Sequence, residues 1–285
     1  MRWYPSLMAC FNRIVDRQLS ASVVLHHSDL EHLRLTLTSL VRAAEMADVV
    51  PYLVVVDQSL DGDYSRQAQA LVQDLWHSMG DAEFLIAADN KGYGAGHNRA
   101  LKHGLCTFHL ILNPDVALDE RALEQGLATL RQDQSITLLA PRSVDESGRE
   151  EYLAKSMPSV GVLALRAFGS VSLRRRFSAA LARYECHDLP SEGAPHPITL
   201  ASGCCMLVRG DSLQQVDGFN EAFFLYFEDY DLSLRLTRYG RICRDPQMII
   251  RHYGGEAARK GWRHIVWFMS GGIRFFNRWG WRFSG

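Results

Sequence analysis

Tyr52-Leu53-Val54-Val55-Val56 is a continuous apolar run that follows Pro51 and ends at Asp57. An uninterrupted apolar run of this length is typical of a strand buried on both faces of a parallel sheet. Short apolar runs alternate with longer amphipathic ones on both sides of it. They predict strands at residues 22–26, 83–87 and 108–112, and helices at 30–46, 64–79 and 96–104. This alternation predicts an α/β fold with a mostly parallel, Rossmann-like central sheet flanked by helices.

The second half of the chain has a less regular pattern. It predicts a helix at 118–133, strands at 136–140 and 248–251, a regular segment at 198–209 and a helix at 229–239. Residues 141–197 show no clear periodicity, and they include the basic cluster Arg174-Arg175-Arg176. No composition shift suggests a linker. We therefore expect one domain over residues 1–252 with a variable insertion at about 141–197, followed by a helical segment at 253–285.

The composition excludes several classes of protein. The 285 residues carry a formal net charge of −1, which argues against a nucleic-acid partner. The six cysteines are scattered without a C-x-x-C pair, so we expect a reducing compartment and neither a disulfide framework nor a cysteine zinc site. The sequence contains no signal-peptide pattern and no apolar run long enough to span a membrane, which predicts a soluble or peripheral protein.

Polar residues follow the predicted strands at their carboxyl ends, where ligands bind in sheets of this kind. Asp57 can accept hydrogen bonds from a nucleobase or a ribose, although the Asp, Ser and Gly residues around it also suit a turn. The glycines of Asn90-Lys91-Gly92-Tyr93-Gly94-Ala95-Gly96-His97-Asn98 allow the backbone to approach a phosphate at a helix N-terminus. A flexible loop is the alternative. The segment follows the third strand and lacks the last glycine of the dinucleotide fingerprint, which argues against a nicotinamide or flavin enzyme.

Two acidic motifs are the other candidates for chemistry. Asn113-Pro114-Asp115 closes a strand and offers an oxygen ligand for Mg²⁺ or Mn²⁺, or else a cap for the next helix. Glu228-Asp229-Tyr230-Asp231 follows the five apolar residues 223–227, and apolar surroundings raise a carboxylate's pKa, as general-base catalysis requires. The alternatives are capping of a helix and an i,i+4 pair between Asp231 and Arg235 on its surface.

Together and in this order, these motifs resemble those of family 2 glycosyltransferases of the GT-A fold, and within that family the rhamnosyltransferase-like branch that builds bacterial surface polysaccharides. The similarity extends from about residue 22 to residue 252. The segments that carry it are Val55-Val56-Asp57, the glycine segment 90–98, Asn113-Pro114-Asp115, Ser202-Gly203 with Met206-Leu207-Val208-Arg209, Gly218-Phe219-Asn220-Glu221 and Phe224-Leu225-Tyr226-Phe227-Glu228-Asp229-Tyr230-Asp231-Leu232.

The resemblance implies a role for each motif. Asp57 matches the residue that binds the nucleobase, and Asp115 matches the last carboxylate of the D-x-D motif, which holds Mg²⁺ or Mn²⁺ against the nucleotide diphosphate. Asp229 matches the base that deprotonates the acceptor hydroxyl, with Glu228 in support. His252 resembles a late histidine that approaches the metal or the diphosphate. The remaining nucleotide-sugar contacts would come from Asn90, Lys91, Gly92, Gly96, Asn98 and Asn113.

The implied reaction is an inverting transfer from a dTDP- or UDP-sugar, with rhamnose as the sugar that the branch suggests. The acceptor would be a glycan or a lipid-linked glycan, met by a cytoplasmic protein that is peripheral on the inner face of the plasma membrane. Two departures stand out: Asn113 occupies the first position of D-x-D, which predicts modest metal affinity, and His26-His27-Ser28 ends the first strand. A sugar nucleotidyltransferase would carry a glycine-rich basic loop there, and a non-catalytic carbohydrate-binding protein is the second alternative.

The carboxyl-terminal segment has a composition of its own. Residues 251–285 hold seven basic residues, one acidic residue, Glu256, and eight Trp or Phe side chains. Val266, Met269, Ile273 and Phe276 recur at helical spacing, and Gly271-Gly272 would kink such a helix. Aromatic residues beside arginines predict an interfacial helix on an anionic membrane leaflet. A terminal helix packed on the sheet, with solvated arginines, is the alternative.

Overall fold

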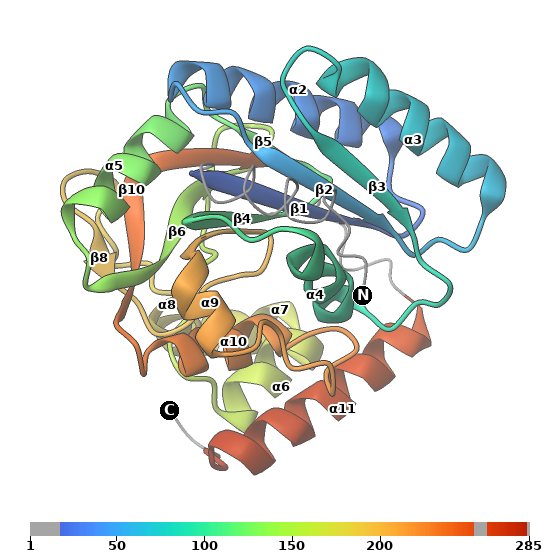
Figure 1. Cartoon of the computed structure of the whole chain (residues 1–285). Coiled ribbons are helices and arrows are strands. Elements are labelled where there is room, and N and C mark those ends of the chain that lie inside the picture. Colours follow the sequence, from blue (N-terminus) through green and yellow to red (C-terminus); the bar gives the residue numbers. More distant parts are fainter. Residues whose placement is uncertain (1–17, 254–260, 284–285) are drawn as a thin grey trace, which may run out of the picture.

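The computed structural model describes residues 18–253 and 261–283, so Glu256, Arg259 and Lys260 of the basic segment lie outside the described residues. Within the described ranges, ten strands form one sheet, and eight of them follow the order β3-β2-β1-β4-β9-β6-β10-β5. The remaining two are β7, which pairs with β6, and β8, which pairs with β10. Helices cover both faces of this sheet (Figure 1).

The first half of the sheet is parallel, as the sequence predicts. Its strands are β1 (Leu19–Leu25), β2 (Tyr52–Asp57), β3 (Ala82–Ile86) and β4 (Phe108–Leu112). The connecting helices are α2 (Leu30–Met46), α3 (Gly62–Trp76) and α4 (Tyr93–His103). α2 and β4 match their predicted bounds residue for residue. Asp29 caps α2 and Asp61 caps α3, each by accepting backbone N–H groups of the first turn.

The second half of the sheet is mixed. β9 (Cys205–Arg209) lies antiparallel between β4 and β6 (Ile136–Val144), and β5 (Val116–Leu118) is antiparallel to β10 (Arg241–His252). β6 and β10 are parallel, and the short strands β7 (Glu150–Glu151) and β8 (His196–Pro197) extend this region.

Two predicted elements of this half were wrong in extent. The helix predicted from residue 118 begins only at Ala122, as α5 (Ala122–Gln132), because the residues before it pair as β5. The strand predicted at 248–251 is the end of the longer β10. Its first part was hidden by Arg244 and Asp245, which are buried in the strand because Arg244 pairs with Glu150 and Asp245 accepts from Thr129 (2.7 Å).

Helices pack on the two faces as separate layers. α2, α3 and α5 cover one face, while α4, α9 (Gly210–Gln215) and α10 (Glu228–Leu236) cover the other (Figure 1). Leu33, Leu37 and Leu40 of α2 recur at helical spacing and are fully buried in the larger core cluster. Burial of this stripe accounts for the position of α2, because each such side chain contributes about 1.5–3 kcal/mol when it leaves water.

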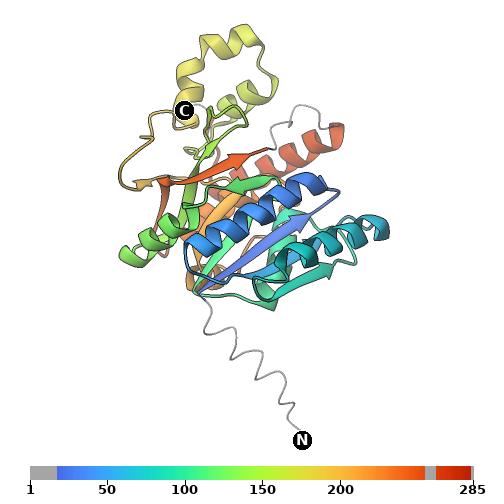
Figure 2. The ribbon, with the colours of Figure 1, turned by 90° about the horizontal axis from the view of Figure 1, so that it is seen from above.

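A third group of helices packs beside α10. α6 (Val160–Phe168), α7 (Val171–Arg176) and α8 (Ser178–Tyr184) stand away from the sheet (Figure 2). α11 (Trp262–Trp279) packs with α6 and α10 in a cluster that includes Leu163, Phe227, Phe275 and Phe276. No helix in the two described ranges is long and apolar enough to cross a bilayer.

The predicted kink at Gly271-Gly272 is absent from α11, which runs as one helix over both glycines. The glycines instead allow close packing against the segment before α10. A Cβ atom on Gly271 would lie 2.9 Å from the carbonyl oxygen of Tyr226 and 3.1 Å from the Phe227 ring. A Cβ atom on Gly272 would lie 3.5 Å from the same ring, which is an ordinary contact.

The two glycines therefore predict opposite responses to alanine. Alanine gains about 1 kcal/mol over glycine in a helix interior, so Gly272→Ala should raise the melting temperature or leave it unchanged. Gly271→Ala should lower it, because overpacking against a backbone carbonyl costs about 1–3 kcal/mol. Differential scanning calorimetry of the two variants measures the direction of each change in melting temperature. A higher melting temperature for Gly271→Ala would show that the close approach carries no constraint.

Candidate active site

The motifs meet at one edge of the sheet because of strand direction. β1, β2 and β4 are parallel and end together, with Leu25 opposite Asp57 and Val23 opposite Leu112. β9 is antiparallel to β4, so it begins at the edge where β4 ends, with Cys205 opposite Leu112. The N–H of Asn113 donates to the carbonyl of Cys204 (2.8 Å). The Asn113–Asp115 motif and the Ser202-Gly203 motif are therefore neighbours in space.

A strained backbone brings the acidic motif to the same edge. Tyr226 and Phe227 have φ values of 72° and 67°, a left-handed conformation that is rare for aromatic residues. α10 begins directly after them, at Glu228. The Oδ2 atom of Asp229 accepts a hydrogen bond from the N–H of Gly203 (3.0 Å), and the Tyr93 hydroxyl donates to the Gly203 carbonyl. Three separate motifs are thus joined at Gly203.

The two adjacent carboxylates have different environments. Glu228 is only 4% exposed, and its Oε2 atom has no hydrogen-bond partner within the described residues. Burial first, and the neighbouring Asp229 second, raise the pKa of Glu228 well above its ordinary value. Burial also raises the pKa of Asp229, to about 6, against the hydrogen bonds from Gly203 and Tyr230 that lower it. Burial therefore favours the protonated form of both carboxyl groups, and more strongly that of Glu228.

Asp229 lines a cavity of about 330 Å³. Most of the other walls come from the predicted insertion, and include Glu151, Tyr152, Lys155, Arg166 and Glu185. Burial lowers the pKa of Lys155 to about 8. Sequence reasoning missed these residues, because a buried lysine such as Lys155 or an exposed arginine such as Arg166 has no distinguishing pattern in an irregular segment. Carboxylates and tyrosines together provide hydrogen-bond acceptors and flat apolar surfaces, a lining that suits a hydroxyl-rich ligand.

Asp115 and Asn113 have the character expected of a cation site. The Oδ1 atoms of both side chains are buried without a hydrogen-bond partner in the described part of the chain. Asp115 does not cap a helix, since α5 begins seven residues later. His252 Nε2 lies 3.7 Å from Asp115 Oδ1, and its Nδ1 lies 3.2 Å from Glu151 Oε2.

These oxygen and nitrogen donors fit a divalent ion that takes its other ligands from phosphate and water. They do not form a complete protein cage. Among residues 18–253 and 261–283, no group of three or more His, Cys, Asp or Glu side chains could hold a metal ion. The pairing of Asp115 with His252 agrees with the predicted ligands, and the roles of both as metal ligands stay predictions.

Asp57 and the glycine segment lie on the other side of this edge. Asp57 is buried and accepts hydrogen bonds from the Ser59 N–H (2.9 Å) and from the Ser65 hydroxyl. These are the local contacts expected of an aspartate in a turn. Asn90 Oδ1 accepts from the N–H of Gly92 (2.9 Å). Lys91 is largely exposed and lies 3.4 Å from Asp89. A nucleotide contact by Asp57, Asn90 or Lys91 stays a prediction.

The glycines of this segment serve close packing. Gly92 has a φ of 97°, and a Cβ atom there would lie 1.9 Å from the Phe224 carbonyl oxygen. The N–H of Tyr93 donates to that same carbonyl (3.0 Å), so this first N–H of α4 is not open to an anion. A Cβ atom on Gly96 would lie 2.6 Å from Val24 of β1. The glycine segment thereby joins the sheet to the strained segment before α10.

The side chains of Asn98 and Gln58 stabilise the glycine segment and its neighbours through hydrogen bonds. Asn98 donates to the Phe219 carbonyl (2.9 Å) and to Glu221 (3.0 Å) and accepts from the Phe219 N–H (2.8 Å). These contacts fix the Gly218–Glu221 motif, and a direct nucleotide contact of Asn98 stays a prediction. Gln58, which the sequence analysis did not single out, donates to the Gly92 carbonyl (3.0 Å). Its only signal in the sequence is its place directly after Asp57.

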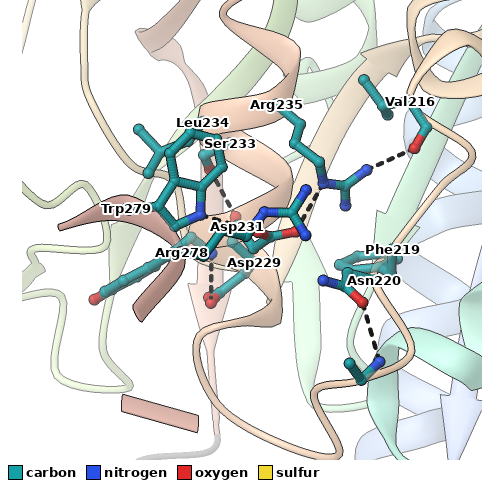
Figure 3. Close-up of polar contacts among 12 residues, drawn as sticks. Val216, Phe219, Asn220, Asp229, Asp231, Ser233, Leu234, Arg235, Arg278 and Trp279 are labelled. Atoms are coloured by element: carbon teal, nitrogen blue, oxygen red, sulfur yellow. Dashed lines mark hydrogen bonds and ion pairs between the residues drawn. The ribbon is translucent and has the colours of Figure 1, made fainter. Parts of the chain in front are cut away.

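The predicted surface pair of Asp231 and Arg235 is buried instead. Asp231 is fully buried, and its Oδ2 accepts from Arg235 Nε (2.7 Å) (Figure 3). Its Oδ1 accepts from Trp279 Nε1 (3.0 Å) and lies 3.2 Å from Arg278 Nε. The same carboxylate therefore ties α10 to the end of α11. This role was hidden, because i,i+4 spacing is the same for a surface pair and a buried one.

Comparisons with known proteins agree with this geometry, although no protein-family model matches the chain. The chain is 25% identical over 193 residues to a low-salt glycan biosynthesis hexosyltransferase of Haloferax volcanii, covering 66% of the chain and 54% of that protein. It is 29% identical over 230 residues to an N-acetylglucosaminyl-diphospho-decaprenol L-rhamnosyltransferase of Mycobacterium tuberculosis, covering 76% and 70%. The chain thus spans about half the length of the first relative.

Solved structures show the fold. TarS 1–349 of S. aureus matches with a TM-score of 0.57 and 18% identity, over 91% of this chain and 72% of that one. GalNAc-T7 with UDP, GalNAc and Mn²⁺ matches with a TM-score of 0.64 and 12% identity, over 92% and 48%. Both neighbours have the GT-A fold, so the predicted GT-A fold and the resemblance to glycosyltransferases are confirmed.

The environment of Glu228 predicts a dependence of stability on pH. Its folded pKa lies above the unfolded value of 4.5, so its stabilising contribution is complete below that value and is lost as pH rises toward the folded pKa. Glu228→Gln carries no such proton. Its melting temperature relative to the natural protein should therefore increase between about pH 4 and pH 8. Glu45→Gln, an exposed change on α2, is the control. Equal differences at every pH would contradict the prediction.

Proposed function

We propose that this chain is an inverting glycosyltransferase that transfers a sugar from a nucleotide diphosphate to a glycan or lipid-linked glycan. The observation that carries the proposal is the position of Asp229, a carboxylate with a pKa of about 6 at the wall of a polar cavity. A general base works best when its pKa lies near the operating pH. The similarity to a hexosyltransferase and a rhamnosyltransferase supports the same reaction class.

In the proposed reaction, Asp229 takes the proton of the acceptor hydroxyl. The N–H of Gly203 orients its carboxylate through Oδ2, while Glu228 lies buried in the interior. The other carboxylates that line the cavity are Glu150, Glu151 and Glu185. Each of them lies within 4 Å of an arginine or histidine nitrogen, so Asp229 is the cavity carboxylate without a basic partner in the described residues. A glycosidase instead uses two carboxyl groups placed on opposite sides of the scissile bond. A single base supports direct displacement by the acceptor, which inverts the anomeric carbon.

Asn113, Asp115 and His252 would hold a divalent ion at the same edge. Mg²⁺ or Mn²⁺ bound there would supply charge stabilisation to the departing diphosphate. The buried Oδ1 atoms of Asn113 and Asp115 support this assignment, and a structural neighbour was crystallised with UDP and Mn²⁺.

The neighbours support the proposed class of donor. TarS has been crystallised with UDP and with UDP-GlcNAc, which supports a UDP- or dTDP-sugar. The mycobacterial relative is named for a diphospho-decaprenol acceptor and for L-rhamnose, which supports a lipid-linked acceptor and a rhamnose donor. We assign catalysis to residues 1–252 and a peripheral position on the inner face of the plasma membrane to the carboxyl-terminal helical segment.

Two other functions remain to be separated by experiment. A sugar nucleotidyltransferase would release diphosphate from a nucleoside triphosphate, and a carbohydrate-binding protein would turn over nothing. We expect hydrolysis or transfer of a nucleotide diphosphate sugar with Mg²⁺ or Mn²⁺, in a screen of UDP- and dTDP-sugars. Binding of a glycan without any turnover of a nucleotide sugar would favour the binding protein.

Asp229→Asn tests the base directly. The change keeps the size of the side chain and removes its basicity, so kcat should fall about 10²-fold or more while donor affinity changes little. Activity of the natural protein should fall as pH drops below about 6, because the base becomes protonated. Asp211→Asn, in the first turn of α9, is the matched control. An active Asp229→Asn with an inactive Glu228→Gln would reverse the assignment.

Asp115→Ala tests the metal site. We expect loss of activity with the fold retained, and loss of activity of the natural protein in a chelator, reversed by added Mg²⁺ or Mn²⁺. Calorimetric titration of Mn²⁺ with UDP present should show weaker binding by Asp115→Ala than by Asp119→Ala, an acidic residue four positions later. Full activity in chelator together with an active Asp115→Ala would exclude a role for the ion.

A further inference from the structure

Residues 160–184, which form α6, α7 and α8 and are here called the arm, carry exposed apolar side chains that the proposed reaction does not use. Four of them are between 45% and 68% exposed: Phe168, Val171, Leu173 and Phe177. The cluster Arg174-Arg175-Arg176 ends α7 among them and is exposed as well. Large apolar side chains grouped on a surface mark an interaction site rather than ordinary exposure.

α11 has a similar outer face. Its inner face is buried through Gly271, Gly272, Phe275 and Phe276. On its outer face, a stripe at helical spacing is about half exposed or more: Trp262, Ile265, Val266, Met269 and Ile273. α11 therefore packs on the domain, but against α6, α10 and the segment before α10 instead of on the sheet as one interpretation predicts. It also presents the apolar face that the other interpretation predicts.

The arm and the end of α11 are joined. The N–H of Val160 donates to the Arg282 carbonyl (2.7 Å), and the N–H of Gly161 donates to the Phe283 carbonyl (3.3 Å). Leu163 of α6 shares a core cluster with Phe275 and Phe276 of α11. Figure 1 shows α6, α7 and α11 on the side of the molecule that lies away from α2 and α3.

The charge of these segments has one sign. Residues 157–184 and 261–283 contain nine arginines and no acidic residue, in a chain whose net charge is −1. Arg166 pairs with Glu185 (3.4 Å) and Arg278 with Asp231 (3.2 Å), both outside these stretches. The remaining residues carry 22 basic against 32 acidic side chains, so the excess of positive charge lies on the segments that expose apolar side chains.

We propose that the arm and the outer face of α11 together bind an anionic phospholipid bilayer. Large apolar side chains beside arginines match a bilayer interface, where apolar groups enter the acyl boundary and arginines meet anionic headgroups. The role that we give to membrane binding rests on the proposed glycosyltransferase function. Arg166 of α6 lines the cavity that holds Asp229, so a lipid-linked acceptor would reach the base from the surface that the arm contacts.

Flotation of the full chain with vesicles tests the proposal. The natural protein should float with phosphatidylcholine–phosphatidylglycerol vesicles, float less in high salt, and float poorly with phosphatidylcholine alone. The triple change Arg174→Ser, Arg175→Ser and Arg176→Ser should lower the partition coefficient by about 100-fold. The matched control is Arg34→Ser, Arg42→Ser and Arg66→Ser, three exposed arginines of α2 and α3, and it should bind as the natural protein does.

A second pair of variants tests the apolar part. Phe168→Ser, Val171→Ser, Leu173→Ser and Phe177→Ser together should abolish flotation. The control set is Leu35→Ser, Met46→Ser, Val50→Ser and Leu60→Ser, of similar exposure on other elements, and it should have no effect. Equal flotation of arm and control variants would overturn the proposal. So would a stable dimer of the natural chain that the arm variants dissociate and that does not bind vesicles.

Turnover of the nucleotide sugar, measured in solution without lipid, separates this proposal from the proposed function. The arm variants should hydrolyse the donor at the natural rate, since none of the changed residues lines the cavity. Loss of flotation with donor turnover intact supports the membrane-binding face. A natural protein that turns over the donor without binding vesicles overturns only this proposal, whereas vesicle binding without any turnover overturns only the proposed function.

Discussion

The left-handed backbone at Tyr226 and Phe227 is the constraint on which the site depends. Two such residues cost about 1–3 kcal/mol each, and they persist only where the surrounding structure fixes them. Phe227 is 4% exposed and packs against the rings of Tyr230, Phe268 and Phe275. The strained turn directs Glu228 into the interior and Asp229 to the cavity. One local conformation thereby gives two adjacent carboxylates opposite environments.

α11 is part of this constraint and not an addition to a finished domain. It meets the strained turn through Gly271 and reaches Asp231 through Arg278 and Trp279 (Figure 3). A fully buried carboxylate is strongly destabilising unless it is paired and hydrogen-bonded. Asp231 meets that requirement with partners from both α10 and α11. The helix with the exposed outer face is therefore joined directly to the helix that carries Asp229.

The sequence predicts the parallel half of the sheet well, because most residues of each strand there are apolar and α2 and α3 have clear apolar stripes. β5 is too short for a pattern, and β10 contains the buried polar residues Arg244 and Asp245, whose partners lie far away in the sequence. The residues of the candidate site also divide into those that the sequence predicts and those that it does not. Motifs at strand ends are visible in the sequence, whereas the cavity residues Lys155 and Arg166 become adjacent to Asp229 only through tertiary packing.

Local rules are broken together at one edge of the sheet. Asn113, Asp115 and Glu228 each have a buried oxygen without a hydrogen-bond partner in the described ranges, and the left-handed turn lies directly before Glu228. Each unsatisfied polar atom costs about 1–3 kcal/mol. Packing alone would remove such costs, since an apolar residue of similar shape would be more stable at each position. Thr36, Trp76, His97 and Arg235 also have such an atom within the described ranges. The three at this edge belong to the acidic motifs, where stability is expected to be exchanged for chemistry.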